Sequence, residues 1–289
     1  MLEIKDLHKR FGDTIALDGV SLTAAPGEVV GFVGANGAGK TTTMRIAMGV
    51  LAADSGQIVY NGSPLGVEHR RRFGYMPSER GLYPKMKTGE QIAYFGELHG
   101  MSRAEARRSA ADLLDQLNLT ARAGDFVQDL SLGNQQRVQL AVSLVHDPEA
   151  LILDEPFSGL DPLAVDVMGT ALKDRAAAGA PVIFSSHQLD LIERLCDSVV
   201  IIGNGRIIAA GGVDELKAKE VKQLRVSVQT GEDLTAALPG AVTRDGDDYL
   251  VEDADDQEVL RIAAAAGRVT HFAYDQPTIA EIFREAVTR

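Results

Sequence analysis

One stretch near the N-terminus constrains this chain more than any other. Residues 28–47 read EVVGFVGANGAGKTTTMRIA, in which an apolar, β-branched run ends abruptly at a glycine-rich loop and helically spaced apolar residues follow. Residues 34–41 match the pattern G-x-x-x-x-G-K-[ST], whose glycines let successive backbone N–H groups face an anion. The sequence therefore predicts a strand, a phosphate-binding loop and a helix, in that order.

The residue types in this loop suit a triphosphate and its metal ion. Lys40 is placed to neutralise the β- and γ-phosphates, the Thr41 hydroxyl is placed to ligate Mg2+, and the helix N-terminus adds positive potential. A glycine turn with a chance lysine is the alternative, which the flanking strand and helix disfavour. The residues expected to bind the nucleotide are Gly34, Ala35, Asn36, Gly37, Ala38, Gly39, Lys40, Thr41 and Thr42.

A second predicted strand ends in two carboxylates. Residues 150–156 read ALILDEP, and their first four residues are a continuous apolar run typical of buried parallel strands. Ligands of open α/β sheets bind at the carboxyl ends of the strands. We therefore expect Asp154 to hold Mg2+ through its water shell, and Glu155 to orient or deprotonate an attacking water. A solvated acid at a strand end is the alternative for this pair taken alone.

A histidine follows a third apolar run. Residues 181–187 read PVIFSSH, which places His187 at the end of another predicted strand. On the same sheet edge as Asp154 and Glu155, its imidazole can reach a γ-phosphate and fix the attacking water. A structural histidine with satisfied hydrogen bonds is the alternative.

The start of another helix is suited to an anion, although no nucleotide motif lies near it in the sequence. Residues 130–141 read LSLGNQQRVQLA. Ser131 supplies a hydroxyl, Gly133 permits a close backbone approach, and the helix N-terminus supplies positive potential. The stretch alone does not say whose anion it would hold.

Taken together and in order, GANGAGKT, LSLGNQQR, LILDEPFSGLD and SSH resemble the nucleotide-binding subunit of an ABC transporter. The resemblance covers residues 1–220 and is nearest to exporter cassettes of the ABC-2-like drug, sodium and antibiotic class. It implies an α/β, P-loop NTPase cassette with a mixed sheet core, an antiparallel β subdomain and a helical subdomain at about residues 80–145. It also implies ATP and Mg2+ as ligands, with Glu155 and His187 as the catalytic pair.

The resemblance answers the question of the second anion site. In this family two cassettes pack head to tail, which implies that Ser131 and Gly133 of one copy bind the γ-phosphate held by another copy or a paralogous cassette. Phe11 occupies the place of the aromatic residue that stacks on adenine, and a core residue of the first strand pair is the alternative. Asp161 matches the loop that links the two sites, and it is also placed to cap the helix beginning at Pro162.

Two places depart from the family pattern. Leu132 and Asn134 replace the second glycine and the glutamine of the commoner signature LSGGQ. In residues 74–87, GYMPSERGLYPKMK, Ser78 stands where the family usually has a glutamine that contacts Mg2+ and water. A serine is too short to reach as a glutamine does, so either Glu79 substitutes or a water bridges the gap.

A composition shift after residue 220 marks a second, small α+β domain at residues 221–289. Its pattern is strand, short helix (residues 232–238), strand, strand, helix, strand, which is the ferredoxin-like order. Thr278 and Glu281 predict a capped final helix. This tail resembles an accessory domain of such cassettes, and its sequence shows no metal set, nucleophile or glycine loop.

Charge and hydropathy narrow the partners. The 289 residues carry 29 Lys and Arg against 41 Asp and Glu, a net charge of −12, which argues against binding nucleic acid. No run approaches the roughly 18 apolar residues that span a bilayer, and residues 1–10, MLEIKDLHKR, lack the apolar core expected of a signal peptide. The single cysteine, Cys196, excludes an internal disulfide. We expect a cytoplasmic chain, peripheral on the cytoplasmic face of the membrane, that works with an integral-membrane permease.

The function expected from these features is ATP hydrolysis by a head-to-tail dimer that closes on two Mg-ATP and powers a separate membrane exporter. The alternative is a soluble ABC-type ATPase acting on DNA or ribosomes, although such proteins carry coiled-coil insertions or two cassettes in one chain. A third interpretation makes residues 221–289 a ligand-sensing regulator, by fold-level analogy alone.

Overall fold

The computed structural model describes residues 1–79, 81–219, 223–275 and 278–282. These residues form two compact units, residues 1–213 and the described part of residues 214–285. The helix α8 (Val213–Lys219) stands at the start of the second unit. The division therefore falls after the first residue of this helix, whereas the composition of the sequence shifts after its end.

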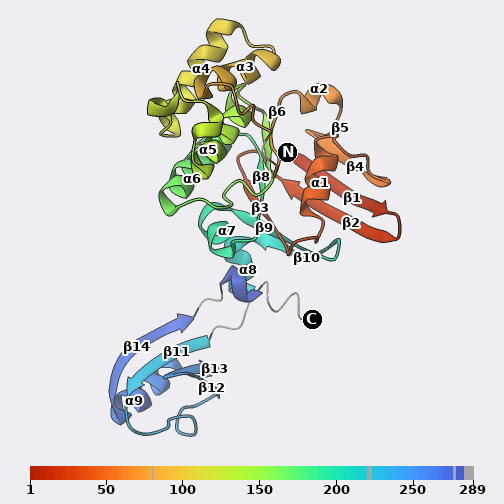
Figure 1. Ribbon diagram of the computed structural model, residues 1–289. Coiled ribbons are helices and arrows are strands. Elements are labelled where there is room, and N and C mark those ends of the chain that lie inside the picture. The colour runs from red at the N-terminus through yellow and green to blue at the C-terminus, as the bar shows by residue number, and fades with distance from the viewer. Residues whose placement is uncertain (80, 220–222, 276–277, 283–289) are drawn as a thin grey trace. The chain divides into compact units, whose positions relative to one another are not determined.

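The first unit is built on a six-stranded mixed sheet with the order β10-β9-β3-β8-β7-β6 (Figure 1). Neighbouring strands run parallel, except that β9 and β10 form an antiparallel hairpin. β3, β7 and β8 are buried along their whole length, which explains their unbroken apolar sequences. The strands are β3 (Val29–Val33), β6 (Phe73–Met76), β7 (Ala150–Leu153), β8 (Val182–Ser186), β9 (Ser198–Gly203) and β10 (Arg206–Gly212).

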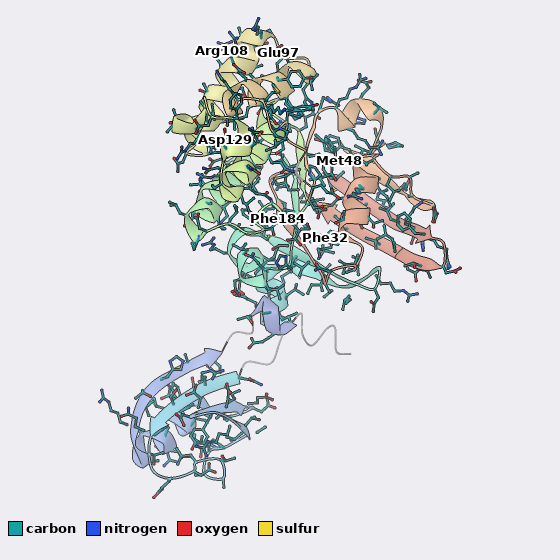
Figure 2. The ribbon with its side chains drawn as sticks, viewed as in Figure 1. Phe32, Met48, Glu97, Arg108, Asp129 and Phe184 are labelled. Atoms are coloured by element: carbon teal, nitrogen blue, oxygen red, sulfur yellow. The ribbon has the colours of Figure 1, made fainter. Side chains whose placement is uncertain are left out.

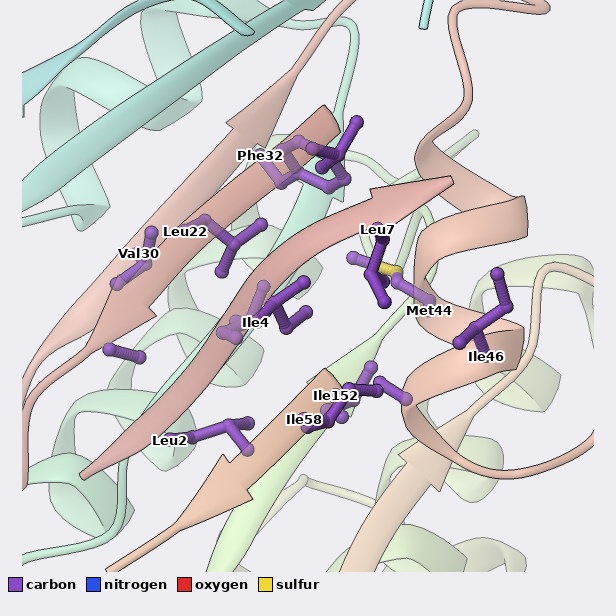
Figure 3. Close-up of a cluster of buried hydrophobic side chains, with 14 of the residues drawn as sticks. Leu2, Ile4, Leu7, Leu22, Val30, Phe32, Met44, Ile46, Ile58 and Ile152 are labelled. Carbon is purple, nitrogen blue, oxygen red and sulfur yellow. The ribbon is translucent and has the colours of Figure 1, made fainter. Parts of the chain in front are cut away.

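A four-stranded antiparallel sheet, with the order β2-β1-β4-β5, shares a core with the central sheet and α1. Figure 3 shows Leu7 of β1 beside Met44 of α1, with Phe32 and Ile152 in the same cluster. Each such buried side chain contributes roughly 1.5–3 kcal/mol, so the core fixes α1 and the loop before it. The strands are β1 (Leu2–Phe11), β2 (Thr14–Ala24), β4 (Ser55–Tyr60) and β5 (Ser63–Pro64).

Helices cover the central sheet and form a separate helical part. α3, α4 and α5 pack against one another, and Glu97 of α3 and Arg108 of α4 mark its outer end in Figure 2. Phe32 and Phe184 mark the buried sheet core in the same view. The helices are α1 (Lys40–Ala47), α2 (Val67–Arg70), α3 (Thr88–Leu98), α4 (Arg103–Gln116), α5 (Leu132–Leu144), α6 (Pro162–Ala177) and α7 (Leu189–Leu195), with 3-10 turns at Thr120–Arg122 and Val127–Asp129.

Cys196 follows α7 and packs against the central sheet. A Cβ atom added at Gly31 of β3 would lie 2.9 Å from its Sγ atom. Burial raises the pKa of the Cys196 thiol. None of the described helices is long and apolar enough to cross a membrane.

The second unit is an antiparallel sheet with the order β12-β13-β11-β14, which α9 covers through a shared apolar core. This is the strand order of a ferredoxin-like fold. Thr278 and Glu281 form the expected cap, described as far as residue 282. The elements are β11 (Gln223–Gln229), β12 (Ala241–Asp245), β13 (Asp248–Glu252), α9 (Asp256–Ala266) and β14 (Arg268–Asp275).

The prediction of a short helix at residues 232–238 is wrong. The segment makes one turn, closed by the Leu238 N–H donating to the Leu234 carbonyl at 3.0 Å. The Asp233 carboxylate accepts from the N–H and hydroxyl of Thr235, a local bond that competes with helix formation. Pro239 follows at once and prevents further helical bonds.

Candidate nucleotide-binding site

The phosphate-binding loop joins β3 to α1, as expected. Gly37 and Gly39 have φ values of +82° and +112°, which favour glycine. A Cβ atom at Gly39 would lie 2.8 Å from the Ala16 carbonyl oxygen, whereas nothing lies within 4 Å of a Cβ atom at Gly37. The loop is thus pressed against β2 at one end and open at its centre, where a phosphate would approach.

Lys40 opens α1 and its side chain is buried inside the loop. Its Nζ donates to the carbonyl of Gly34 at 2.5 Å and to that of Ala35 at 3.3 Å. Burial lowers the pKa of Lys40, while the carboxylates of Glu155 and Asp154 oppose that shift. The loop therefore holds a desolvated positive charge, whose attraction for a phosphate is stronger than in water.

Asp154 lies at the carboxyl end of β7 and is buried. Its Oδ1 accepts from the Ser185 hydroxyl at 2.6 Å, and its backbone N–H donates to the Met76 carbonyl at 2.7 Å. Its other oxygen, Oδ2, is buried without a hydrogen-bond partner. A buried carboxylate oxygen without a partner is costly, and this one fits the water shell of a cation.

The side chains available in the cleft suit an Mg2+ ion that phosphates would bind as well as the protein. No group of three or more His, Cys, Asp or Glu side chains able to hold a metal occurs in the part of the chain that the structure describes. Mg2+ characteristically takes one or two protein ligands and completes its shell with water and substrate phosphates. Asp154 and Thr41 suit that ligand set.

Glu155 brings three predicted residues together. Its Oε1 lies 3.9 Å from Lys40 Nζ, and its Oε2 lies 2.8 Å from Nδ1 of His187. Its φ of +52° is uncommon outside glycine, and its N–H donates to the Ser185 hydroxyl at 2.8 Å, which holds that conformation. A partly exposed carboxylate between a lysine and a histidine can accept a proton from water.

Lys40, Asp154 and Glu155 line one cleft of about 180 Å³, which His187 does not border. It is formed by residues 35–42 together with Asp154 and Glu155. Every predicted loop residue except Gly34 therefore borders it, as do both strand-end acids.

The second anion site that the sequence predicts lies at the start of α5, where Ser131 is exposed. The Ser131 hydroxyl accepts from the N–H of Asn134 at 3.4 Å, which makes Ser131 the N-cap. A Cβ atom at Gly133 would lie 3.4 Å from the side chain of Leu160, which is an ordinary van der Waals contact. Neither Ser131 nor Gly133 borders the 180 Å³ cleft.

Comparison with known proteins decides the family. Residues 17–158 match the ABC transporter family, and residues 211–287 match the C-terminal domain of DrrA1-3-like ATP-binding proteins. The ABC transporter ATP-binding protein YhaQ of Bacillus subtilis (strain 168) is 36% identical over 294 residues, covering 99% of this chain and 98% of YhaQ. The chain belongs to the ABC transporter ATP-binding proteins.

Other members of this ABC family match a smaller share of the chain. The Nod factor export ATP-binding protein I of Paraburkholderia xenovorans (strain LB400) is 38% identical over 223 residues, which cover 76% of this chain and 73% of that protein. The structure of an ATP-binding subunit of an ABC transporter superposes with a TM-score of 0.70 at 36% identity, covering 76% and 92% of the two chains. As a member of this family the cassette is an ATPase.

Two further predicted residues of the ABC cassette lie apart from the cleft. Asp161 caps α6, where its carboxylate accepts from the N–H of Ala164 at 2.8 Å. Phe11, at the end of β1, is half exposed, and Lys9 Nζ lies 5.5 Å from its ring centroid. Phe11 is thus available for stacking and is not a core residue, while Asp161 has the capping role that the sequence allowed.

The position of the missing glutamine is occupied by a different arrangement. Ser78 and Glu79 follow β6, and the Glu79 carboxylate pairs with the guanidinium of Arg45 on α1. That pairing lowers the pKa of Glu79 and raises the pKa of Arg45. Glu79 is therefore held as an anion next to the phosphate-binding helix, bound to Arg45.

Sequence reasoning missed three residues that support the site. Ser185 bridges Asp154 and Glu155, and Gln136 and Gln139 of α5 bind the loops beside them. The signal for Ser185 was its place two residues before His187. Nothing in the sequence pointed to Gln136 and Gln139, apart from their place in the helix that begins within the signature stretch LSLGN.

Proposed function

We propose that this ABC cassette binds Mg-ATP in the 180 Å³ cleft and hydrolyses it as one half of a head-to-tail dimer that drives a separate membrane exporter. The observation that carries the proposal is the convergence of Lys40, Asp154 and Glu155 on one cleft, while Ser131 lies exposed outside it. Such a division supports a site that a second cassette completes.

The cleft residues suit each part of phosphoryl transfer to water. The backbone N–H groups of residues 35–41 and the Lys40 ammonium neutralise charge on the phosphates. Glu155 orients the attacking water and accepts its proton, and the 2.8 Å bond from His187 fixes the Glu155 carboxylate. Asp154 and Thr41 would hold Mg2+, which would supply further positive charge to the phosphates.

The second cassette, whether another copy or a paralogue, would supply Ser131 and Gly133 to the γ-phosphate. The exposed N-terminus of α5 offers free N–H groups and positive potential for that contact. Leu132, which replaces a glycine of the common signature, is 60% exposed there and would enter the interface.

The membrane partner would bind an aromatic surface of the helical part, formed by Tyr83, Tyr94, Phe95 and Leu98. The Tyr83 ring lies 6.1 Å from that of Tyr94 and 6.0 Å from that of Phe95, centroid to centroid. Tyr83 and Leu98 are 49% and 59% exposed, and aromatic residues are enriched in protein interfaces. The matching Nod factor export protein supports an exporter, and a permease partner would place this chain on the cytoplasmic face of the membrane.

A soluble ABC-type ATPase acting on DNA or ribosomes is the second candidate. The net charge of −12 disfavours it, because phosphate-backbone binding needs clustered Lys and Arg. The accessory domain also matches that of DrrA1-3-like ATP-binding proteins.

The decisive experiment captures the partner. A tagged Glu155→Gln chain is expressed in its native cells, and the membranes are solubilised gently with Mg-ATP. We expect a stoichiometric membrane-spanning chain to co-purify, and Glu155→Gln/Lys40→Ala to lose the ATP dependence of that recovery. Recovery with ribosomes or DNA and no membrane chain would favour the second candidate.

A further inference from the structure

The helix α5, which begins within the signature stretch LSLGN, binds two loops of its own cassette, one after β7 and one after β6. Gln136 donates from Nε2 to the backbone carbonyls of Glu155 and Pro156, at 3.2 and 3.0 Å. Three residues later, Gln139 repeats the contact on the loop that follows β6. Residues three apart share a helix face, so one face of α5 holds the loops that follow two neighbouring strands.

Gln139 is the more informative of the two glutamines. Its Nε2 donates to the carbonyls of Pro77 at 2.8 Å and Glu79 at 3.2 Å. The side chain is 4% exposed, and its Oε1 is buried without a hydrogen-bond partner. An unpaired buried acceptor costs about 1–3 kcal/mol, which an apolar side chain would avoid. The two contacts of Nε2 are what distinguish glutamine from such a side chain.

The loop that Gln139 binds, residues 77–79, lies beside Asp154, the proposed metal ligand. Met76 precedes Pro77, and its carbonyl accepts from the N–H of Asp154 at 2.7 Å. Residues 77–79 therefore continue from a strand end fixed to Asp154. A shift of this loop would move Ser78 relative to the cleft. Position 78 carries a serine, so no side chain as long as glutamine reaches the cleft from there.

The other end of α5 is the proposed contact with the second cassette. Ser131 caps the helix, and Val138, Leu140 and Ala141 further along it are fully buried. A packed helix moves as a unit, because its backbone hydrogen bonds resist local bending. A pull on Ser131 would therefore displace Gln136 and Gln139 together.

We propose that Gln139 couples the two ATP sites of the dimer. It positions residues 77–79, and hence Ser78, according to whether Ser131 of the same chain engages the phosphate bound by the second copy. Gln136 makes the parallel contact to Glu155. Gln139 is a positioning residue, and the proposal rests on the dimeric ATPase proposed above.

The test measures steady-state hydrolysis by the full chain as a function of ATP concentration. Gln139→Met keeps the size of the side chain and removes the donor. The matched control is Gln91→Met. Gln91 of α3 is also fully buried, and its side chain makes two hydrogen bonds, of 2.9 and 3.0 Å, to the backbone of Tyr83, which follows residues 77–79 in the chain. Thermal denaturation of both variants tests folding.

For wild type we expect a Hill coefficient above about 1.5, because two coupled sites allow at most 2. Gln139→Met should lower the Hill coefficient to about 1. It should also lower kcat roughly tenfold, because two hydrogen bonds are lost, while KM stays within about twofold of the wild-type value. Gln91→Met should keep the wild-type coefficient. An unchanged coefficient in Gln139→Met, an equal loss in Gln91→Met, or a wild-type coefficient of 1 would each overturn the coupling while leaving the ATPase intact.

A wild-type chain that hydrolyses no ATP would instead overturn the proposed function. Should Gln139→Met not fold, hydrogen exchange on the Glu155→Gln chain decides the question. Added Mg-ATP should slow amide exchange in residues 74–79 and 130–136 together. Slowing confined to residues 130–136 would exclude the transmitted movement.

Discussion

The hydroxyl of Ser185 donates to Oδ1 of Asp154 at 2.6 Å in the buried interior of the cassette. The Ser185 hydroxyl oxygen also accepts a hydrogen bond from the N–H of Glu155 at 2.8 Å. Because both serine bonds are shielded from water, they fix the Asp154 carboxylate and the uncommon backbone of Glu155 at once. One side chain thus sets the geometry of both acids.

Replacing Ser185 by alanine should therefore damage catalysis more than nucleotide binding. A hydrogen bond to a charged group such as the Asp154 carboxylate is worth about 1.5–3 kcal/mol, so Ser185→Ala should lower kcat about 10- to 100-fold. It should also raise the Mg2+ concentration needed for half-maximal rate. Ser143→Ala, which removes another buried hydroxyl that donates to the Leu140 carbonyl, is the control in the same kinetic assay. Wild-type kcat and Mg2+ dependence in Ser185→Ala would contradict the role.

Lys40→Ala should remove ATP binding. The buried ammonium is the positive side chain among the residues bordering the cleft, and its loss leaves Asp154 and Glu155 to repel the phosphates. We expect the Kd for Mg-ATP to rise more than about 100-fold in equilibrium binding, the scale of about 3 kcal/mol. Lys173→Ala, at an exposed lysine on α6, should bind as wild type does.

Glu155→Gln should bind ATP but not turn it over. The amide keeps the size of the side chain and cannot accept a proton, so hydrolysis should fall at least about 100-fold, a typical contribution of general-base catalysis. Size-exclusion chromatography with light scattering should show an ATP-dependent dimer that persists. Hydrolysis at the wild-type rate would remove Glu155 from the catalytic role.

The stacked histidines of the cassette predict a pH-dependent stability. The rings of His99 and His146 lie 3.6 Å apart, centroid to centroid, and burial, with His99 second, lowers the pKa of His146 to about 4. The unfolded chain takes up this proton near pH 6.5, whereas the folded chain resists it until about pH 4. Stability from this group is therefore complete above pH 6.5 and is lost as the pH falls towards 4.

His146→Phe should remove this part of the acid destabilisation. Urea unfolding at pH 7.5 and pH 5 should show a wild-type loss about 1–2 kcal/mol larger than that of the variant, within the linkage limit of the shift. His271→Asn, at an exposed histidine of the second unit, should leave the difference unchanged. An identical loss in wild type and His146→Phe would refute the assignment.

The phosphate-binding loop and the strand-end acids could be predicted because their chemistry is written in contiguous residues. Glycines at residues 34, 37 and 39 impose a loop, and an apolar run fixes where Asp154 emerges. The meeting of His187 with Glu155 also followed, since the carboxyl ends of parallel strands share one edge.

The supporting contacts could not be predicted, because they depend on register. Ser185 reaches Asp154 only because β7 and β8 pair with Leu153 opposite Phe184. The pairing of Glu79 with Arg45 joins a loop to a helix face, and no local pattern announces it. The failed helix at residues 232–238 shows the same limit, because a side-chain bond of Asp233 outweighed its weak helical pattern.

The half-buried thiol of Cys196 need not be removed before the chain is labelled with dyes. Its raised pKa keeps it protonated at neutral pH, and protonated thiols react slowly with maleimides. A cysteine introduced at Leu163, which is 72% exposed beside Asp161, would therefore be modified selectively without first removing the native one. Donor and acceptor dyes on two such chains could report the approach of the cassettes by energy transfer, in real time and without a coupled assay.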